Sequence, residues 1–283
     1  MKARDACTIR FATLVNSPGK GLMNQLFVSQ SLHLVRVGSL PRCRTAVRVG
    51  NLFRWSCRIA LIAVVAALCL NDADAQENAS STFDGRSFSG WTTIDGDPVT
   101  EGWRIEEGVI SLDASSKPGH IITKRLFGDF DLSFEWKIAK GGNSGLKYRV
   151  RDYDGYPRGC EYQILDDAAY RSDVTSKTSA GALYGLYEPN QEKFLKPPGE
   201  FNSARIVVRC GRVEHWLNGR LVLSAQIGSA EWKRRVAESK FGEYQDFAMN
   251  PCGRIMLTDH GHDVWFRNFE FRPLEKRGSG SSR

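Results

Sequence analysis

The sequence has 283 residues and a formal net charge of +7, from 39 lysines and arginines against 32 aspartates and glutamates. Residues 1–75 carry this excess, because they hold ten basic and three acidic residues and leave 29 of each sign in the remainder. Binding to nucleic acid requires a basic surface, and the chain beyond residue 75 has no excess of positive charge. Its composition therefore excludes a general role in binding nucleic acid.

An uninterrupted run of twelve apolar residues, 59–70, follows Arg54 and Arg58 and precedes the motif Ala-Asp-Ala at 73–75. This order is typical of a secretory signal peptide, with cleavage expected before Gln76. A membrane helix is the alternative, but twelve residues fall short of the roughly 20 that span a bilayer. We therefore expect an exported protein, periplasmic or extracellular, with no stable insertion in the membrane after cleavage.

The signal sequence also divides the chain into predicted parts. We expect translation to begin near residues 47–52, and a genuine long leader is the alternative. A domain of about 190 residues is long enough for a substantial core. The predicted parts are a leader (1–75, with the signal peptide at about 52–75), a linker (76–82), one jelly-roll domain (83–274) and a disordered tail (275–283).

Short strands are predicted throughout the domain. The clearest is 130–138, FDLSFEWKI, in which apolar and polar residues alternate strictly. Such alternation is typical of an antiparallel strand with one buried face. Further strands are predicted at 103–110, 144–151, 161–165, 182–187, 204–209, 213–217, 253–258 and 264–271.

Turn residues and one helix complete the predicted fold. Asn218-Gly219, between VEHWL and RLVL, is typical of a type I′ hairpin. Ser229 before AEWKRRVAESKF predicts the N-cap of one short helix, with Trp232 and Val236 on one face. Many short strands separated by turns predict an all-β fold, a two-sheet antiparallel jelly-roll sandwich.

Polar side chains gather on one face of two neighbouring predicted strands. Glu161 and Gln163 share a face because side chains alternate with period two, and Asn143, Lys147 and Arg149 share a face of the preceding strand. A hairpin would bring Lys147 and Arg149 near Glu161. Solvated ion pairs, each worth about 0.2–1 kcal/mol, are one interpretation. The density of charges and amides favours the other, a polar floor suited to the hydroxyls of a sugar.

The segment 258–268, TDHGHDVWFRN, adds acidic and imidazole groups. His260 and His262 could hold a metal from one strand face, but Gly261 between them indicates a turn and no third ligand follows. A structural role for these histidines is the simpler interpretation. The sequence requires no cofactor, and a divalent cation stays open.

Cysteines and aromatic residues allow alternatives. Cys160, Cys210 and Cys252 have no paired spacing, so they form either one disulfide and one free thiol or three free thiols. Sugars stack on aromatic rings, but most rings in a sandwich fill the core. Tyr184 lies among small residues and is assigned to the site. Four further aromatic residues are assigned neither to the core nor to the site: Tyr162, Tyr187, Trp216 and Trp265.

Seven motifs in sequential order resemble the secreted 3-keto-disaccharide hydrolase family, also described as 3-keto-glucoside 1,2-lyase and 3-keto-2-hydroxy-glucal hydratase. The resemblance covers essentially the whole of 83–274. It implies a concanavalin-like or laminin-G-like jelly roll that acts on sugars oxidised to a ketone at C3. The motifs are FDG…GW (83–91), NSGLKYR (143–149), EYQILDD (161–167), SAGALYGLYEP (179–189), KPPGEFN (196–202), VEHWLNG (213–219) and TDHGHDVWFRNFEFRPL (258–274).

Two positions depart from the pattern that the resemblance implies. The family usually has a glutamine and a tryptophan where this chain has Thr258 and Phe201. Thr258 removes a long amide beside Asp259 and His260. The change at Thr258 is expected to cause either an altered choice of substrate or a loss of activity.

The implied chemistry gives each polar residue a role. A ketone at C3 acidifies the proton at C2, so a base can remove it, the group on C1 leaves, and hydration of the double bond releases a 3-keto sugar. This requires a base with a pKa near neutral, a donor or metal that stabilises the enolate and an acid for the leaving oxygen. We expect Glu161 to be the base or a metal ligand, Lys147 or Arg149 to steady the enolate, and His260 to be the proton partner. The roles can be exchanged among Glu161, His260 and Asp259. The residues expected to orient hydroxyls are Asn143, Gln163, Asp166, Tyr184 and Asp259.

A non-catalytic carbohydrate-binding jelly-roll module is the main alternative, because fold alone does not separate binding from catalysis. Such a module needs aromatic and polar groups but no base with a shifted pKa. An envelope-associated interaction domain is a third hypothesis. It would expose an apolar patch instead of a polar concavity.

Overall fold

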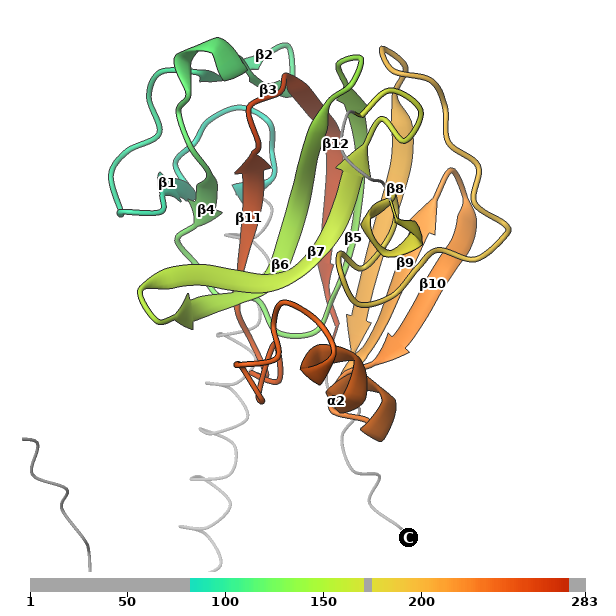
Figure 1. Ribbon diagram of the computed structural model, residues 1–283. Helices are drawn as coiled ribbons and strands as arrows, with labels where there is room; N and C mark the ends of the chain where they lie inside the picture. Colours follow the sequence, from blue (N-terminus) through green and yellow to red (C-terminus); the bar gives the residue numbers. More distant parts are fainter. Residues whose placement is uncertain (1–81, 171–174, 275–283) are drawn as a thin grey trace, which may run out of the picture. The chain divides into compact units, whose positions relative to one another are not determined.

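The computed structural model describes residues 82–170 and 175–274. The predicted leader and tail, and all of the linker except Thr82, lie outside the described residues. Within them the strands form two sheets in which every pairing is antiparallel, and Figure 1 shows β6 and β7 in front of β5 and β12.

The five-stranded sheet has the order β1-β4-β11-β6-β7. Its two longest strands, β6 and β7, are joined by a tight turn and form a hairpin that extends beyond its neighbours (Figure 1). The strands are β1 (Trp91–Thr93), β4 (Ile121–Thr123), β6 (Asn143–Tyr153), β7 (Tyr156–Leu165) and β11 (Arg254–Asp259).

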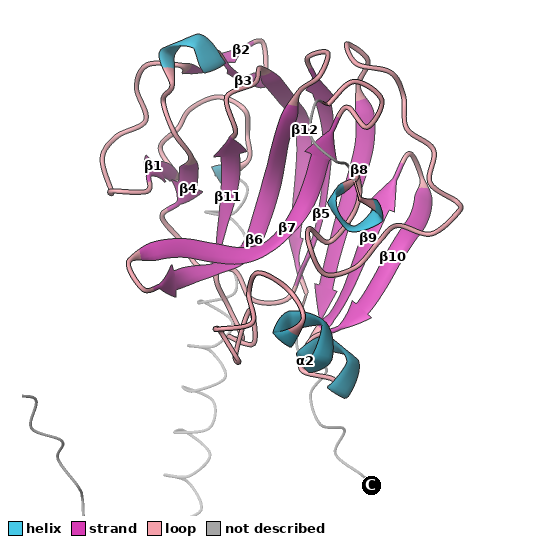
Figure 2. Ribbon diagram, in the orientation of Figure 1, coloured by secondary structure: helices cyan, strands magenta, loops and turns pink. Residues whose placement is uncertain are grey.

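The seven-stranded sheet has the order β10-β9-β8-β5-β12-β3-β2. Two short 3-10 helices, Ala114–Ser116 and Ser176–Thr178, and the helix α2, Ala230–Ala237, lie outside the two sheets, with α2 below the lower ends of the strands in Figure 2. The strands are β2 (Trp103–Glu106), β3 (Val109–Leu112), β5 (Phe130–Ile138), β8 (Asn202–Arg209), β9 (Arg212–Leu217), β10 (Arg220–Gln226) and β12 (Val264–Pro273).

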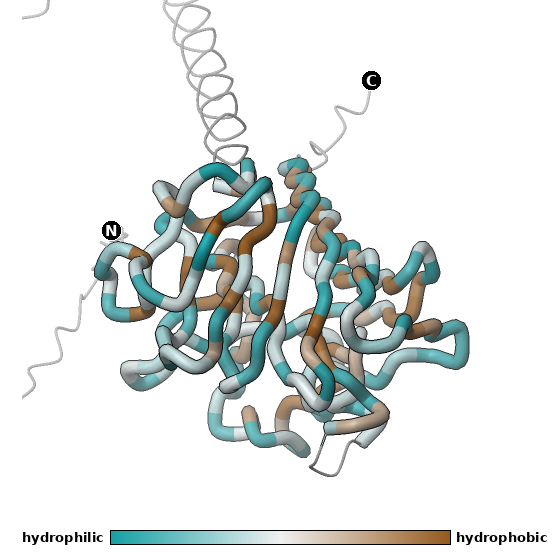
Figure 3. Tube along the Cα trace, turned by 90° about the horizontal axis from the view of Figure 1, so that it is seen from above, coloured by the Kyte–Doolittle hydropathy of each residue, from teal (hydrophilic) through white to brown (hydrophobic). Residues whose placement is uncertain are grey.

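The core fills the space between the sheets. Hydrophobic and hydrophilic residues are interleaved along the chain (Figure 3), as alternate side chains of each strand turn inward. On β5, Phe134 meets Tyr162 of β7 with ring centroids 5.8 Å apart, and both side chains are buried. The predicted fold class, a two-sheet antiparallel jelly-roll sandwich with one short helix, is confirmed.

The local predictions at the hairpin and the helix are also confirmed. Asn218 and Gly219 both have positive φ, 49° and 78°, as a type I′ turn requires, and they join β9 to β10. The hydroxyl of Ser229 accepts a hydrogen bond from the amide of Trp232 at 3.1 Å, which caps α2. Trp232 and Val236 are the buried residues of this helix.

The predicted strand at 182–187 is wrong. Gly181 and Gly185 have φ values of 81° and 72° and turn the chain where a strand would have to run straight. The segment instead makes isolated bridges, including one from Leu183 to Tyr162 of β7. It therefore lies along the free edge of β7, where its backbone can bond to that strand.

A buried histidine joins the two sheets. His215 of β9 lies 2.9 Å from the hydroxyl of Tyr148 of β6 through Nε2, and 3.1 Å from the carbonyl of Gly181 through Nδ1. A carbonyl can only accept, so Nδ1 carries the proton and Nε2 accepts from the tyrosine. Burial lowers the pKa of His215 to about 4. This neutral histidine has a structural role.

The three described cysteines are free, with Cys160 buried, Cys210 exposed and Cys252 partly buried. In the part of the chain that the structure describes, no helix has the length and apolar character needed to cross a membrane.

Candidate active site

Two rows of side chains cross the outer face of the five-stranded sheet. Directly paired residues of neighbouring antiparallel strands project from the same face. One row runs from Glu161 on β7 through Lys147 on β6 to Met256 on β11. The second runs from Gln163 through Gly145 to Thr258 on the same three strands. Three of the residues expected on one polar face, Glu161, Gln163 and Lys147, therefore share a face of this sheet, which we call the polar floor.

Glu161 lies on this floor at the edge strand β7 and is only 7% exposed. Its carboxylate occupies the space above Gly145, where a Cβ atom would lie 2.4 Å from Glu161 Oε1. The main chain of Glu161 is tied down as well, because its carbonyl accepts a hydrogen bond from the amide of Tyr184 at 3.0 Å. The missing side chain at Gly145 is what lets the carboxylate lie flat against the sheet.

Cationic and imidazole groups surround this carboxylate. Lys147 Nζ lies 4.0 Å from Glu161 Oε2, and its side chain is 13% exposed. His260 Nε2 lies 3.5 Å from Glu161 Oε1, and its side chain is 34% exposed. The turn after β11 thus brings an accessible imidazole to a buried carboxylate.

The pKa of Glu161 reflects these neighbours. Burial raises the pKa, but the positive charge of Lys147, the hydrogen bond and charge of His260, and the charge of Lys240 together lower it below the ordinary value of 4.5. Glu161 is therefore an ionised carboxylate at neutral pH. A base tuned upward toward neutrality, as the chemistry was expected to require, is not what this environment produces.

The structure adds His120, which the sequence analysis missed. It directly precedes β4, and its Nδ1 accepts a hydrogen bond from the amide of Asp259 at 2.9 Å. Its Nε2 therefore carries the proton and donates to the hydroxyl of Tyr156 at 2.9 Å. Burial, with the charges of Lys147 and His260, lowers the pKa of His120 to about 4. Its ring centroid lies 5.7 Å from that of His260.

Asp259 shapes the turn that carries His260. Its Oδ2 accepts from the amide of Gly119 at 3.1 Å and its Oδ1 from the amide of Gly261 at 2.8 Å. Both carboxylate oxygens are thus engaged by main-chain donors. The geometry gives Asp259 a positioning role toward His260 instead of a free carboxylate for the reaction.

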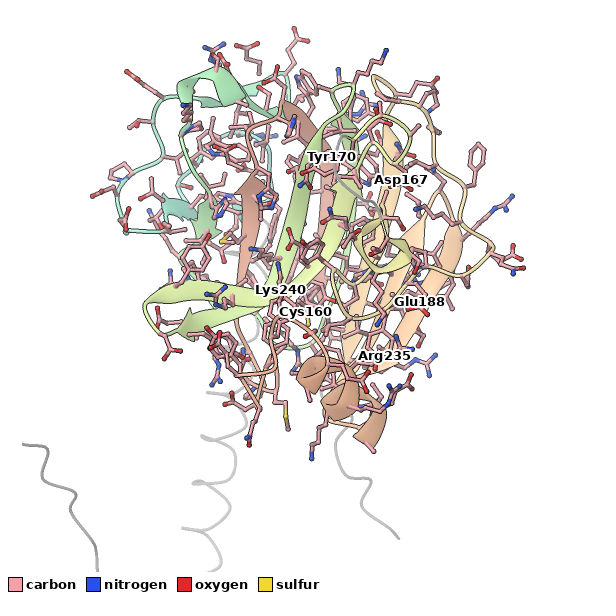
Figure 4. All side chains as sticks on the ribbon, in the orientation of Figure 1. Cys160, Asp167, Tyr170, Glu188, Arg235 and Lys240 are labelled. Carbon is pink, nitrogen blue, oxygen red and sulfur yellow. The ribbon has the colours of Figure 1, made fainter. Side chains whose placement is uncertain are left out.

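Gln163 and Asn143 belong to a line of side-chain hydrogen bonds. Gln163 Nε2 donates to Asn143 Oδ1 at 3.1 Å, and Asn143 Nδ2 donates to the hydroxyl of Tyr170 at 3.1 Å. The ring of His262 lies edge-on to that of Tyr170, with ring centroids 6.0 Å apart. This line extends the polar floor toward the end of β7, where Figure 4 labels Tyr170.

Tyr184 and Lys240 flank Glu161 from outside the sheet. Lys240 Nζ lies 4.2 Å from the ring centroid of Tyr184, and Figure 4 shows Lys240 in front of β6 and β7. Burial and the charges of Glu161 and Tyr170 raise the pKa of Tyr184. The segment after α2 thereby supplies a cation that the sequence analysis did not assign to the site.

The structure does not bring Arg149 to this floor. A register shift between Tyr148 and Arg151 breaks the alternation of β6, and Arg149 has a positive φ of 53°. Its side chain is buried, donates to the carbonyl of Asn250 at 2.7 Å and lies 3.7 Å from Asp129. The expectation that Arg149 lies beside Glu161 is wrong because it assumed an unbroken period of two.

Asp166 is likewise bound to the main chain of its own turn. It is 3% exposed, and its carboxylate accepts from the amides of Gly141 at 2.8 Å and Ala168 at 3.2 Å. Because its carboxylate is bound to these amides, Asp166 positions the loop that follows β7.

The two positions that depart from the family pattern, Thr258 and Phe201, lie at different sheets. Thr258 is on the polar floor, fully buried, and its hydroxyl donates to the carbonyl of Gly145 at 3.2 Å. Phe201 lies at the other sheet, with the Arg267 guanidinium 3.8 Å from its ring centroid. Thr258 is therefore the departure that bears on Glu161 and His260.

In the described ranges, no group of three or more His, Cys, Asp or Glu side chains could hold a metal ion. Glu161 and His260 together provide two donor atoms. The divalent cation that the sequence left open therefore stays an open alternative.

Comparisons with known proteins agree with this picture. A family model described as a 3-keto-alpha-glucoside-1,2-lyase-like domain matches residues 78–272. A 3-keto-disaccharide hydrolase of Bacteroides thetaiotaomicron (strain VPI-5482) is 33% identical over 224 residues, which are 68% of this chain and 77% of that protein.

Solved structures point the same way. One from Parabacteroides distasonis ATCC 8503, which carries the provisional name glycosyl hydrolase, is 33% identical with a TM-score of 0.62, over 69% of this chain and 93% of that chain. A second from the same organism, with the same provisional name, is 24% identical with a TM-score of 0.53, over 67% and 96% of the two chains, and supports the fold alone. By the extent of these matches, the chain belongs to the 3-keto-disaccharide hydrolase family.

Proposed function

We propose that this protein cleaves 3-keto-glycosides by removing the proton at C2 and eliminating the group on C1, and that it hydrates the resulting 3-keto-2-hydroxy-glucal. Membership of the family supports a carbohydrate substrate and a glycoside-acting enzyme. The observation that carries the finer mechanism is the buried, ionised Glu161 between Lys147 and His260 on the polar floor.

Glu161 acts as the base in this proposal. Its lowered pKa keeps the carboxylate free to accept a proton, although it makes the carboxylate an intrinsically weaker base. The ketone compensates by acidifying the C2 proton. The cations that lower the pKa of Glu161 also favour the negative charge that develops on the enolate oxygen.

Lys147 and Lys240 supply that stabilising charge, and His260 supplies the proton for the leaving oxygen. His260 suits this role because it is the accessible partner of Glu161, while both ring nitrogens of His120 are engaged. Asn143, Gln163 and Tyr184 orient hydroxyls from the two sides of the carboxylate. His120, Asp259 and Asp166 position the turns from which these groups project.

Export completes the proposal. The basic, apolar and Ala-Asp-Ala segments within 54–75 support secretion to the periplasm or beyond. A substrate already oxidised at C3 would then be met outside the cytoplasm.

The test is release of 4-nitrophenol from purified protein incubated with the α and β anomers of 4-nitrophenyl 3-keto-glucoside, with and without EDTA. Release from either anomer, and none from the unoxidised glucoside, is the expected result. Binding of the sugars without release would favour the carbohydrate-binding module and contradict the proposal. Loss of release with EDTA, restored by one divalent cation, would establish the cation.

Replacing Lys147 with methionine should move the acid limb of the activity profile to higher pH. A group whose pKa is lowered loses its charged form only as pH falls through that lowered value, so wild-type activity should persist below pH 4.5, the ordinary value for Glu161. Without Lys147, burial still raises the pKa of Glu161, but the positive charge that contributes most to lowering it is gone. The pKa of Glu161 should then rise.

The measurement is kcat/KM against pH, with an expected loss of about 10²-fold at neutral pH from the missing enolate stabilisation. Lys233→Met, on the exposed face of α2, is the matched control and should leave the profile unchanged. An acid limb at the same pH in Lys147→Met and wild type would contradict the role of Lys147.

A further inference from the structure

The outer face of the seven-stranded sheet carries aromatic rings that the active site does not use. Trp216 on β9 lies between the buried His215 and Leu217, and Trp265 on β12 lies between the buried Val264 and Phe266. Alternation therefore turns both tryptophans outward, and both are only partly buried. Phe201, directly before β8, is also partly buried. These rings lie on the opposite side of the sandwich from Glu161.

The rings line two hollows that open on this face. A hollow of about 890 Å³ is lined by Trp265, Phe201 and Lys137, among others. A second, of about 680 Å³, is lined by Trp216, with Arg205 and three serine or alanine residues of β5 and β8. Asn268 borders both, at the register shift of β12, and has a positive φ of 53°. The two hollows thus share a border at the bulge, and we call them together the track.

The pairing of the strands gives the length of this track. Trp216 is level with Arg205 and Ser133, and Trp265 is level with Lys137, four residues further along β5. Three strand spacings across and four residues along place the two tryptophans about 20 Å apart. Such a span exceeds a single sugar ring and matches a short chain of them.

Both arginines that line the track form ion pairs with carboxylates. Arg205 binds Asp131 through two hydrogen bonds of 2.7 Å, and Arg267 binds Glu135 at 2.7 Å. Lys137 lies over the ring of Trp265 at 4.3 Å, in a hollow also lined by Glu106 and Glu107. With Glu270, the two hollows are lined by three cationic and four acidic side chains, so the track has many hydrogen-bond donors and acceptors and no excess of positive charge. An uncharged, hydroxyl-rich ligand complements such a surface better than an anionic one.

We propose that this track binds a strand of neutral polysaccharide, with Trp216 and Trp265 as the stacking platforms at its two ends. Apolar C–H faces of sugar rings stack on such aromatic rings, and hydroxyls pair with the side chains between them. Because the track and the polar floor lie on opposite sheets, a bound strand leaves Glu161 accessible. The surface would hold the protein on a glycan while the other sheet acts on released, oxidised sugars, and its binding does not depend on that activity.

Affinity electrophoresis of the purified protein tests this proposal in gels that contain hydroxyethylcellulose, glucomannan, soluble starch or anionic polygalacturonate. Retardation by at least one neutral polymer is expected. The Trp216→Ala/Trp265→Ala variant should lose at least 10-fold in affinity for that polymer. Phe194→Ala is the matched control, because Phe194 is an exposed ring (53%) outside the track and should be dispensable.

Trp265→Phe keeps an aromatic platform and should retain most of the affinity, which separates stacking from a general effect on the fold. Thermal melting of every variant, with Trp216→Ala alone as the milder change, checks that the fold persists. No retardation by any neutral polymer, retardation by polygalacturonate alone, or unchanged retardation of the folded tryptophan variants would each overturn the proposal.

Discussion

Replacing Glu161 with glutamine is expected to lower kcat for aglycone release about 10²- to 10⁴-fold, the range that removal of a general base produces. Glutamine has nearly the same shape, so it can occupy the space above Gly145 and keep the position of the β7 main chain. It removes the negative charge that accepts the C2 proton in the proposed mechanism. The measurement is steady-state release of 4-nitrophenol from its 3-keto-glucoside.

Glu238→Gln is the matched control for this change. Glu238 follows α2, is exposed, and pairs with Arg234 at 2.9 Å on the far side of that helix from the core. The control should retain wild-type turnover, and both variants should keep the wild-type melting temperature to within a few degrees. Turnover by Glu161→Gln equal to that of the control would remove Glu161 from the mechanism.

Replacing Gly145 with alanine is expected to lower kcat about 10²-fold, the cost of a displacement of roughly 1 Å at a reacting group. The added Cβ would lie 2.4 Å from Glu161 Oε1 and 3.0 Å from its Cδ and Cγ. The buried carboxylate must therefore move out of its place between Lys147 and His260. The measurement is kcat and KM for the same substrate, and the loss should fall mainly on kcat.

Gly128→Ala controls for the general effect of an added methyl group. A Cβ at Gly128 would meet nothing closer than a carbonyl of Pro251 at 3.8 Å. This variant should have wild-type kcat. Unchanged kcat in a folded Gly145→Ala variant would show that the observed placement of Glu161 is not required for catalysis.

The fold was predictable because its signals are local and repeated. The alternation of 130–138 defines β5, Asn218-Gly219 defines a hairpin, and Ser229 defines the start of α2. The exception is the segment 182–187, where apolar residues are compatible with a strand but Gly181 and Gly185 turn the chain. Composition favours a strand there, and the backbone conformation of the two glycines prevents one.

The site was predictable only where a single hairpin builds it. Glu161, Gln163 and Lys147 share a face because β6 and β7 pair directly, and alternation is enough to place them. Arg149 was misplaced because a bulge follows Tyr148, and no residue in the segment marks the bulge. Side chains alternate between the two faces of a strand only as far as the strand keeps its pairing register with its neighbour.

His120 and Lys240 could not be found from local patterns. His120 precedes the three-residue strand β4, whose partner β11 lies more than 130 residues further along the chain. Lys240 reaches Tyr184 from the segment after α2. The only sequence signal for His120 was an isolated histidine between a glycine and two isoleucines, which is more often structural than functional.

Deuterium incorporation at C2 tests the proposed mechanism most directly. The enzyme would convert a 3-keto-glucoside in D₂O, and mass spectrometry and NMR would locate deuterium in the released 3-keto-glucose. Elimination followed by hydration replaces the C2 hydrogen with one from solvent, so the product should carry deuterium at C2 beyond an enzyme-free control. Release of 3-keto-glucose with its original C2 hydrogen would show direct hydrolysis and contradict the role of Glu161 as the base at C2.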